Sequence, residues 1–314
     1  MVDLLKPSKK KSQIKPLPRV VVIIGPTTSG KTSLGIKLAK KFNGEIVSAD
    51  SCQIYRGLDI GTAKPTLKEQ QAILHHLIDI RDQNQSYNAA QYKRDCVKVI
   101  RQILNKDKLP IIVGGTGLYI KAVVDNLTIP HVKADPLLRK ELEQELQDRG
   151  LDFLYNELIK LDPEAAYIVD RRNPRRVIRA LEIAMGTKKP FSQTRRQGKP
   201  LFDFLQIGIN WPEEKLRERI DKRIDAMVGE GLVDEVRNLI KKYSAGTHAF
   251  EAIGYREIID YLQGESSLKA TIELMKKNTW RFAKRQLTWF RKDKSIHWIT
   301  TQAQAEKLAR SFII

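Results

Sequence analysis

The sequence predicts an α/β fold with a P-loop-type, doubly wound parallel sheet and an inserted all-helical subdomain. Short apolar segments alternate with amphipathic segments up to about residue 127, which is typical of parallel sheets with helices on both faces. The first apolar segment runs into a phosphate-binding motif. A charged stretch with helical periodicity and no strand then occupies 135–186. Together these features favour a parallel sheet interrupted by helices.

The expected elements follow this pattern along the chain. Short apolar runs predict strands at 20–24, 45–48, 76–80 and 110–113. Amphipathic segments predict helices at 31–42, 89–105 and 117–126. A strand at 203–210 is expected to return to the sheet, followed by three or four helices and a short strand at 295–300. We therefore expect a flexible basic tail at 1–18, a core formed by 19–127 and 203–314, and a helical insertion at 128–202.

The composition points to a polyanionic partner. The chain has 314 residues, of which 41% are hydrophobic and 30% charged, as expected of a soluble globular protein. Lys and Arg outnumber Asp and Glu by 56 to 37, which gives a formal net charge of +19. Such an excess favours nucleic acid or acidic membrane surfaces. A basic enzyme with no such partner is the alternative, and the distribution of charge decides between them.

The cysteines and the apolar segments indicate a cytoplasmic location. Cys52 and Cys96 show neither metal-ligand spacing nor a disulfide framework, which is typical of a reducing compartment. The Lys-rich start lacks the apolar middle of a secretory signal. No apolar run is long enough to cross a bilayer, so we expect no membrane association.

A phosphate-binding loop follows the first strand. Residues 25–32, "GPTTSGKT", fit the pattern G-x-x-x-x-G-K-[ST], in which backbone N–H groups surround phosphate oxygens. In this pattern Lys31 reaches across the phosphates and the hydroxyl of Thr32 holds Mg²⁺. The expected phosphate-binding residues are Gly25, Pro26, Thr27, Thr28, Ser29, Gly30, Lys31 and Thr32. The motif alone leaves open whether the phosphate is transferred, hydrolysed or lost as a leaving group.

Polar residues at two other strand ends are expected to face this loop, because ligands bind at the carboxyl edge of such sheets. Asp50 follows the second strand, and Thr116 follows Gly114 and Gly115 after the fourth. The glycines would allow a ligand to approach closely. Simpler roles stay open: Asp50 capping a turn or positioning Mg²⁺, and Thr116 capping a helix.

The nucleotide-hydrolysing classes fit less well. Such proteins usually end a neighbouring strand with an acidic residue that holds Mg²⁺, where this chain has Gly-Gly-Thr. Asp79 could serve instead. The segment "NKDK" at Asn105 is not the guanine-reading N-K-x-D, which argues against a GTPase.

Two groups of basic residues indicate contact with a phosphate backbone. Residues 276–294 carry eight Lys or Arg and one acid. On a helical wheel, one stripe holds Lys277, Arg281, Lys284, Arg285, Arg291 and Lys292, and the remaining face holds Trp280, Phe282, Leu287, Trp289 and Phe290, which we expect in the core. The second group is Arg171, Arg172, Arg175, Arg176 and Arg179. Nearly all-positive surfaces are typical of nucleic-acid binding.

Seven segments together resemble the tRNA dimethylallyltransferases, also called tRNA isopentenyltransferases, over 20–299. They are "GPTTSGKT", "SADSCQIYRGLDIGTAKPT", "HHLIDI", "IIVGGTGLYI", "NPRRVIRALE", "AIGYREI" and "AKRQLTWFRKD". The resemblance implies transfer of a dimethylallyl group from dimethylallyl diphosphate to N6 of adenosine 37, beside the anticodon, in tRNAs reading codons that begin with U. The loop would then hold a diphosphate that leaves as pyrophosphate.

The resemblance also implies roles for individual residues. Asp50 matches the general base and Thr116 the threonine at the reacting centre, while Lys31, Arg256 and Mg²⁺ on Thr32 would stabilise the departing diphosphate. Arg256 would also bind the diphosphate. The implied tRNA-binding residues are Asp50, Ser51, Cys52, Gln53, Thr116, Arg175, Arg176, Arg179, Glu251, Gly254, Tyr255, Arg256, Lys284, Arg285, Gln286 and Arg291.

Two residues depart from the family pattern. Thr28 stands where alanine is common, and Glu251 stands where many relatives carry glutamine, which places an acid near RNA. The expected partners are the tRNA anticodon stem-loop and dimethylallyl diphosphate, bound by a monomer. Two other classes stay open: a P-loop kinase acting on a nucleoside or other small metabolite, and a nucleic-acid-binding ATPase or regulator.

Overall fold

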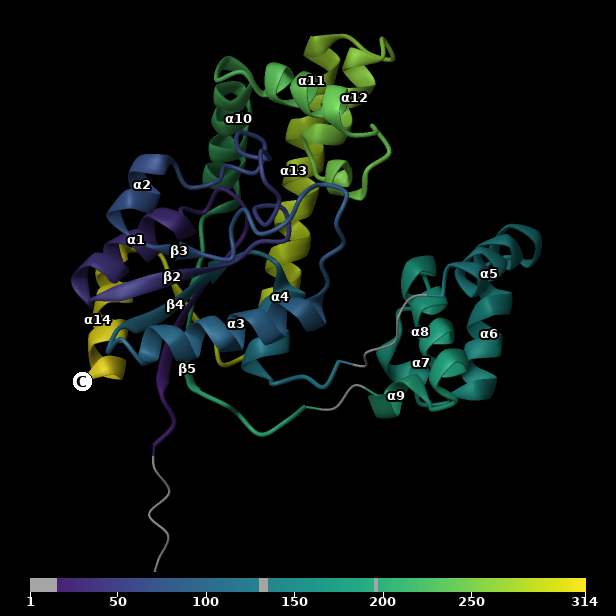
Figure 1. The fold of residues 1–314 in the computed structure, drawn as a ribbon, viewed down its shortest axis with the longest axis horizontal. Coiled ribbons are helices and arrows are strands. Elements are labelled where there is room, and N and C mark those ends of the chain that lie inside the picture. The colour runs from purple at the N-terminus through teal and green to yellow at the C-terminus, as the bar shows by residue number, and fades with distance from the viewer. Residues whose placement is uncertain (1–15, 130–134, 195–196) are drawn as a thin grey trace, which may run out of the picture.

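The computed structural model describes residues 16–129, 135–194 and 197–314. Within them, six parallel strands form one sheet in the order β3-β2-β4-β1-β5-β6 (Figure 1). The strands are β1 (Arg19–Ile24), β2 (Gly44–Ala49), β3 (His75–His76), β4 (Leu109–Gly114), β5 (Asp203–Ile209) and β6 (His297–Ile299). The predicted parallel α/β sheet is confirmed.

Helices cover both faces of the sheet because alternate strand residues point to opposite sides. Val20, Val22 and Ile24 of β1 pack with α3 (Ala89–Leu104) and α4 (Gly117–Val124). Val21 and Ile23 pack on the other face with α1 (Lys31–Lys41) and α14 (Gln302–Ile313). Val20 to Ile24 of β1 are all fully buried, while Arg19 at its start is exposed. The predicted helices at 31–42, 89–105 and 117–126 correspond to α1, α3 and α4.

The strand predicted at 76–80 is wrong, because β3 covers only His75–His76. Leu77 and Asp79 adopt positive φ angles of 61° and 54°, which lie in the left-handed region and end an extended segment. The short helix α2 (Leu67–Ala72) was not predicted. Its capping box, formed by Thr66 and Glu69, is a signal visible in the sequence.

A second helical layer follows β5. It contains α10 (Glu213–Gly229), α11 (Leu232–Lys242), the 3₁₀ helix η1 (His248–Glu251), α12 (Tyr255–Leu262) and α13 (Leu268–Phe290). These helices share a core with Ile54 and Leu58 of the segment after β2. The long helix α13 reaches from this layer to the sheet, because Trp280 lies in the core of the helical layer and Phe290 in a core of the sheet (Figure 1).

The helical insertion has a core of its own. It comprises α5 (Pro136–Arg149), α6 (Leu151–Leu161), α7 (Ala165–Ile168), α8 (Pro174–Thr187) and α9 (Phe191–Thr194). Leu154, Leu158 and Val177 are fully buried among these helices, which stand apart from the sheet (Figure 1). An inserted helical unit is therefore present. The boundaries at 128 and 202 stay predictions, and the predicted tail at 1–18 lies mostly outside the described residues.

Candidate active site

The carbonyl groups of the phosphate-binding loop are occupied by protein side chains. The Pro26 carbonyl accepts a hydrogen bond from Lys31 Nζ at 2.6 Å. The Thr28 carbonyl accepts one from Arg219 Nε, and the Ser29 carbonyl accepts one from Trp211 Nε1, both at 2.9 Å. Arg219 also lies over the Trp211 ring at 5.0 Å from its centroid. These contacts fix the loop at the carboxyl end of β1, where α1 begins.

Several backbone N–H groups of the same loop lack protein acceptors. Within the described part of the chain, the N–H groups of Thr28, Gly30, Lys31 and Thr32 make no hydrogen bond, while that of Thr27 donates to Gln286 Oε1 at 2.8 Å. Gly30 adopts φ 91°, which favours glycine. Unpaired N–H groups at a helix N-terminus form an anion site. The loop is therefore suited to phosphate oxygens, and phosphate binding by these residues stays a prediction.

The surrounding protein makes Lys31 sensitive to pH. Displacement of water lowers the pKa of the Lys31 ammonium to about 8; Asp50 acts to raise this pKa and Arg223 to lower it further. Lys31 is therefore partly neutral in mildly alkaline solution. A phosphate anion favours the protonated form, so its binding is coupled to proton uptake.

We expect the affinity for pyrophosphate to fall as pH rises above 8, by up to roughly tenfold per pH unit, because the free protein loses the Lys31 proton. Titration calorimetry at several pH values measures this dependence. Lys31→Arg is the matched variant, because arginine stays protonated and ionisation of the ligand itself is common to both proteins. A parallel pH dependence in the two proteins would exclude Lys31 as its source.

Asp50 and Thr116 meet at the carboxyl ends of β2 and β4. Asp50 Oδ1 accepts hydrogen bonds from the backbone N–H groups of Cys52 at 2.9 Å and Gln53 at 3.4 Å. Thr116 Oγ1 accepts one from the Ser51 N–H at 3.0 Å. The other oxygen of Asp50 has no hydrogen-bond partner in the described chain. Asp50 thus caps a turn with one oxygen and keeps the second available.

Thr116 occupies the position before α4, but its side chain makes no capping hydrogen bond. Its hydroxyl instead donates to Ser51 Oγ at 3.3 Å. The simple helix-capping role is therefore absent, and the hydroxyl links the ends of the two strands.

Gly114 and Gly115, which precede Thr116, leave room for other parts of the protein and not for a ligand. A Cβ atom on Gly114 would lie 2.2 Å from the Ala49 carbonyl oxygen, and one on Gly115 would lie 2.4 Å from Gln286 Nε2. Gln286 Nε2 donates to the Gly115 carbonyl at 2.9 Å. The expectation of ligand approach at these glycines is wrong, because strand β2 and helix α13 fill the space.

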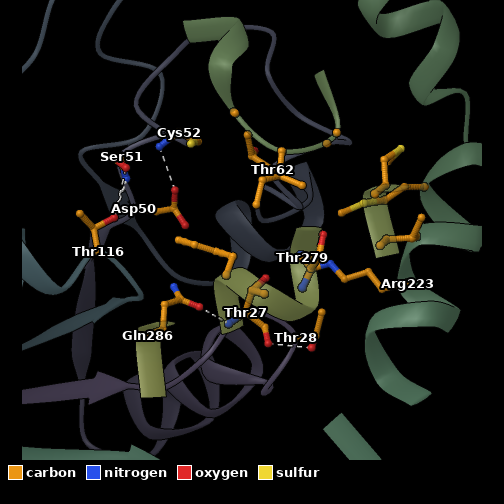
Figure 2. Close-up of a pocket in the computed structure, with 18 of the residues that line it drawn as sticks. Thr27, Thr28, Asp50, Ser51, Cys52, Thr62, Thr116, Arg223, Thr279 and Gln286 are labelled. Atoms are coloured by element: carbon orange, nitrogen blue, oxygen red, sulfur yellow. Dashed lines mark hydrogen bonds between the residues drawn. The ribbon is translucent and has the colours of Figure 1, made fainter. Parts of the chain in front are cut away.

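A cavity of about 330 Å³ joins these groups (Figure 2), a volume typical of small-molecule sites. In this view the Asp50 and Arg223 side chains lie on opposite sides of the cavity, with Thr27 and Thr28 nearby. An apolar wall is formed by Ile224, Met227, Ile253, Met275 and Phe282. Phe282 was expected in the core, but it is 36% exposed and lines the cavity.

Arg223 of α10 is a site residue that the sequence did not reveal. It lies in the cavity wall, and loss of water lowers the pKa of its guanidinium, an effect opposed by Asp50. Its spacing of four residues from Arg219 puts both on one face of α10, which is the signal that could have identified it. Arg256 does not line the cavity: Tyr255 turns inward, so Arg256 on the next position of α12 is exposed.

Three residues expected at RNA have internal partners instead. Tyr255 is fully buried and donates to Glu235 Oε1 at 2.6 Å. Gln286 is 7% exposed and joins the phosphate loop to Gly115. The Gln53 amide donates to the carbonyls of Thr62 and Ala63. In this arrangement the three side chains support the cavity walls, and their predicted contacts with tRNA stay predictions.

The cavity contains no preformed metal cluster. In residues 16–129, 135–194 and 197–314, no three His, Cys, Asp or Glu side chains are placed to hold a metal. Asp79, considered as a Mg²⁺ ligand, is paired with Lys64 at 2.5 Å and does not line the cavity. The Thr32 hydroxyl has no hydrogen-bond partner in the described chain, so it fits a hard cation shared with phosphate oxygens.

Burial and the nearby Asp50 raise the pKa of the Cys52 thiol to about 12. The thiol in the cavity wall therefore stays protonated and is a poor nucleophile.

The basic side chains of α13 lie on its exposed side. Lys277, Arg281, Lys284 and Arg285 are exposed, and Arg285 also lines the cavity. Arg291 and Lys292 are exposed as well, but α13 ends at Phe290, so the helical-wheel position predicted for them does not apply.

The insertion brings a second basic group to the cavity. The Arg175 side chain is 88% exposed and pairs with Glu251, a cavity residue, at 3.7 Å. Arg176 is exposed. Arg179 is half-buried and donates to the buried Glu182 at 3.1 Å, so it also supports the insertion.

Known proteins resemble this chain over most of its length. A family model described as IPP transferase matches residues 53–293. A tRNA dimethylallyltransferase of Acetivibrio thermocellus is 48% identical over 284 residues, covering 89% of this chain and 91% of that protein. One from Bacillus subtilis is 44% identical over 281 residues, covering 89% and 90%.

Two solved structures share the fold. A tRNA isopentenylpyrophosphate transferase of Bacillus halodurans has a TM-score of 0.69 at 39% identity, covering 94% of this chain and 95% of that one. A eukaryotic dimethylallyltransferase described as acting on tRNA has a TM-score of 0.76 at 30% identity, covering 94% of this chain and 77% of that one.

Proposed function

This chain belongs to the IPP transferase family, and on that premise we propose that it transfers a dimethylallyl group from dimethylallyl diphosphate to N6 of adenosine 37 in tRNA. The substrates would be tRNAs reading codons that begin with U, and the product released is pyrophosphate. The enzyme would act as a monomer in the cytoplasm. The observation that carries the proposal is the single cavity that unites the phosphate loop, Asp50, Arg223 and an apolar wall.

The phosphate loop would bind the diphosphate of the donor. Thr27 and Thr28 of this loop line the cavity, and the unpaired N–H groups and Lys31 belong to the same loop. The Arg223 side chain lies in the cavity lining with the apolar residues. Negative charge grows on the diphosphate as its C–O bond breaks, so fixed positive groups stabilise the transition state more than the ground state.

The apolar wall would receive the dimethylallyl group. Ile224 and Met227 follow Arg223 within about one turn of α10, while Met275 and Phe282 face the cavity from α13. An arginine followed by apolar side chains matches a donor with a charged head and a hydrocarbon tail. Burying the tail excludes water from the allylic carbon, which prevents hydrolysis of the donor.

Asp50 would accept the proton of the adenine amine. The N6 nitrogen forms a bond to the allylic carbon, the C–O bond breaks, and its electron pair leaves with pyrophosphate. The excess proton on N6 passes to the free carboxylate oxygen of Asp50. The Thr116 hydroxyl, fixed by Ser51, lies beside this carboxylate at the end of β4. Because a stacked base cannot reach the cavity, adenosine 37 must turn out of the anticodon loop.

Mg²⁺ is the cation that these residues suit. Thr32 would hold it, with the donor's phosphate oxygens completing its ligands. When bound, the ion supplies further charge stabilisation for the departing diphosphate.

The exposed basic residues of α13 and α8 would hold the tRNA backbone on either side of the cavity. Lys284→Ala combined with Arg285→Ala is expected to weaken tRNA binding and to reduce the slope of log K against log salt by about 2, because two fewer phosphates are neutralised by the protein. Fluorescence titrations at several salt concentrations measure this slope.

Lys307→Ala with Arg310→Ala is the matched control for this measurement. It removes the same charge from exposed positions of α14, a helix that does not line the cavity. If both double variants keep the wild-type slope, α13 does not bind the RNA backbone.

A small-metabolite kinase is the second candidate, and the structure offers it less support. No carboxylate follows β4 directly, and Asp79 is paired with Lys64. Incubation with labelled dimethylallyl diphosphate and unmodified tRNA separates the two functions. Label entering RNA supports the transferase, whereas ATP consumption without labelled RNA would replace it with the kinase.

A further inference from the structure

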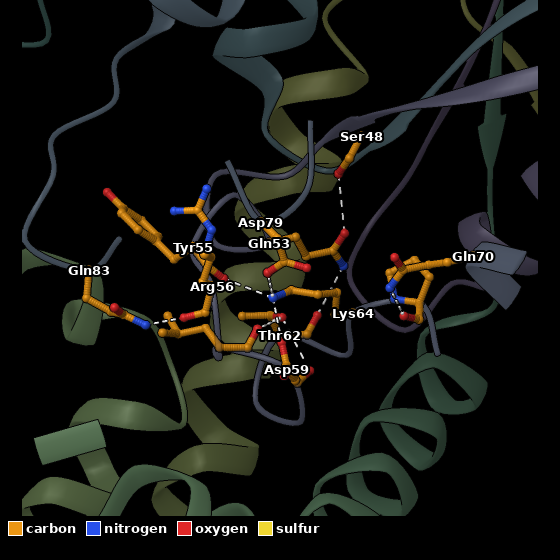
Figure 3. Close-up of polar contacts among 12 residues, drawn as sticks. Ser48, Gln53, Tyr55, Arg56, Asp59, Thr62, Lys64, Gln70, Asp79 and Gln83 are labelled. Carbon is orange, nitrogen blue, oxygen red and sulfur yellow. Dashed lines mark hydrogen bonds and ion pairs between the residues drawn. The ribbon is translucent and has the colours of Figure 1, made fainter. Parts of the chain in front are cut away.

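A buried ammonium group lies next to the cavity without lining it. The Lys64 side chain is 4% exposed. Its Nζ atom donates to Asp59 Oδ1 at 2.5 Å, to Asp79 Oδ1 at 2.5 Å and to the Tyr55 carbonyl at 2.9 Å (Figure 3). An ammonium has three N–H donors, so each has a partner. The group is fully used inside the protein and is not available to a substrate.

These contacts join the segment after β2, residues 51–64, to the segment after β3. Backbone hydrogen bonds run beside them, from the Asp79 N–H to the Gln53 carbonyl at 3.1 Å and from the Ile80 N–H to the Ile54 carbonyl at 2.8 Å. Ala63 and Asp79 adopt φ angles of 47° and 54°. Such angles are unfavourable for these residues in isolation, so the surrounding contacts hold the conformation.

Hydrogen bonds connect the two residues before Lys64 to the turn that holds Asp50. Gln53 Nε2 donates to the carbonyls of Thr62 and Ala63, both at 3.3 Å, immediately before Lys64. The backbone N–H groups of Cys52 and Gln53 donate to Asp50 Oδ1. The carboxylate is therefore oriented by the start of the same segment whose end Lys64 fixes.

The tip of the segment is held separately by α11. Glu235 accepts hydrogen bonds from the N–H groups of Asp59 at 3.2 Å, Ile60 at 2.8 Å and Gly61 at 3.3 Å. A Cβ atom on Gly61 would lie 2.5 Å from the Tyr255 ring, which explains why this position is glycine. The tip is thus fixed by Glu235, while Lys64 and the adjacent backbone hydrogen bonds join the rest of the segment to the chain after β3.

We propose that Lys64 is a positioning residue that closes segment 51–64 onto the sheet and thereby fixes both the Asp50 carboxylate and the cavity wall formed by Gly61 and Thr62. Its catalytic consequence rests on the proposed function. Lys64 contributes through Asp50 and the wall, since it touches neither substrate.

Lys64→Met is expected to lower turnover by roughly 10- to 100-fold, because small displacements of a catalytic group are costly. The KM for dimethylallyl diphosphate should change by less than about threefold, since the phosphate loop has its own contacts. Lys64→Arg keeps a cation for the two carboxylates and should recover part of the turnover.

Lys108→Met is the matched control. Lys108 pairs with the buried Glu45 at 2.8 Å, at the start of β2 and away from the cavity. Burial would raise the pKa of Glu45, but hydrogen bonds from Lys108, His76 and Lys106 lower it to about 2. This variant should therefore lose stability while keeping its turnover at temperatures where it is folded.

Cys52 reports on the segment without any reference to catalysis. The chain has two cysteines, and Cys96 is fully buried, so iodoacetamide labels Cys52 in the folded protein. Its raised pKa keeps this reaction slow. Loosening the segment in Lys64→Met should make labelling several-fold faster, whereas Lys108→Met should match the wild type.

Wild-type turnover together with wild-type labelling in Lys64→Met would overturn the proposal, as would a loss of thermal stability alone. If Lys64→Met does not fold, Asp59→Asn replaces it, because this variant keeps the Lys64 ammonium and removes one of its charged partners. Unchanged turnover and unchanged Cys52 labelling in Asp59→Asn would also overturn the proposal. If the wild type transfers no label to RNA, the proposed function fails, while faster labelling in the variant still supports the role of Lys64 in the segment.

Discussion

Asp50→Asn is expected to lower the rate of dimethylallyl transfer by roughly a hundredfold or more while leaving pyrophosphate binding nearly intact. Asparagine keeps an Oδ1 atom to accept from the Cys52 and Gln53 N–H groups, so the turn is preserved. The variant no longer has the basic oxygen that, on the proposed mechanism, would take the proton from N6. Single-turnover labelling of tRNA gives the rate, and calorimetry with pyrophosphate gives the affinity.

The measurement belongs near pH 7 because Asp50 also acts to raise the pKa of Lys31. Without that carboxylate the Lys31 pKa falls further, so an alkaline buffer would weaken pyrophosphate binding for a second reason. Asp125→Asn is the control, since it removes a half-buried carboxylate paired with Lys121 at the end of α4. Equal decreases of rate and of pyrophosphate affinity in Asp50→Asn would show that Asp50 organises the pocket and is not the base.

Arg223→Gln is expected to reduce kcat/KM for dimethylallyl diphosphate by roughly 10²- to 10³-fold, because a fixed cation beside the departing diphosphate stabilises the transition state. Arg223→Lys should recover only part of this activity, since an ammonium cannot form two parallel hydrogen bonds to a phosphate. Lys222→Gln removes one charge from the neighbouring, 76% exposed position of α10 and should stay close to the wild type.

Comparison of Arg256→Gln with Arg223→Gln tests which of the two arginines binds the diphosphate. The family pattern assigns this role to Arg256, whereas the cavity contains Arg223. Near-normal kinetics in Arg223→Gln with loss of pyrophosphate binding in Arg256→Gln would restore the sequence-based assignment. The reverse result would leave Arg256, exposed on α12, for contact with RNA.

The sequence predicts best what depends on local pattern and strand order. The phosphate loop is recognisable from its own residues, and the meeting of Asp50 with Thr116 follows because parallel strands end at one edge of a sheet. Arg223 lies on a helix far along the chain, and no local pattern shows which face of α10 borders a cavity. Its position depends on the packing of α10 against α13.

Helical periodicity also does not distinguish a core from a cavity wall. Phe282 lies on the apolar side of the wheel, yet it faces the cavity. Tyr255 and Gln286 belong to stretches assigned to RNA as whole segments, but their individual side chains turn inward. The strand expected at 76–80 ends early because Leu77 and Asp79 take left-handed angles, which apolar patterning does not encode.

Helix α13 carries Lys284 on its exposed side, Arg285 exposed at the cavity, and next to it the buried Gln286, which accepts from the Thr27 N–H of the phosphate loop. The tRNA and the loop that would bind dimethylallyl diphosphate would thus both contact neighbouring residues of one helix. A movement of α13 on RNA binding would reach the phosphate loop through the hydrogen bond between the Gln286 amide and the Thr27 N–H. Because such coupling is reciprocal, a bound donor must change the affinity for RNA by the same factor as RNA changes the affinity for the donor.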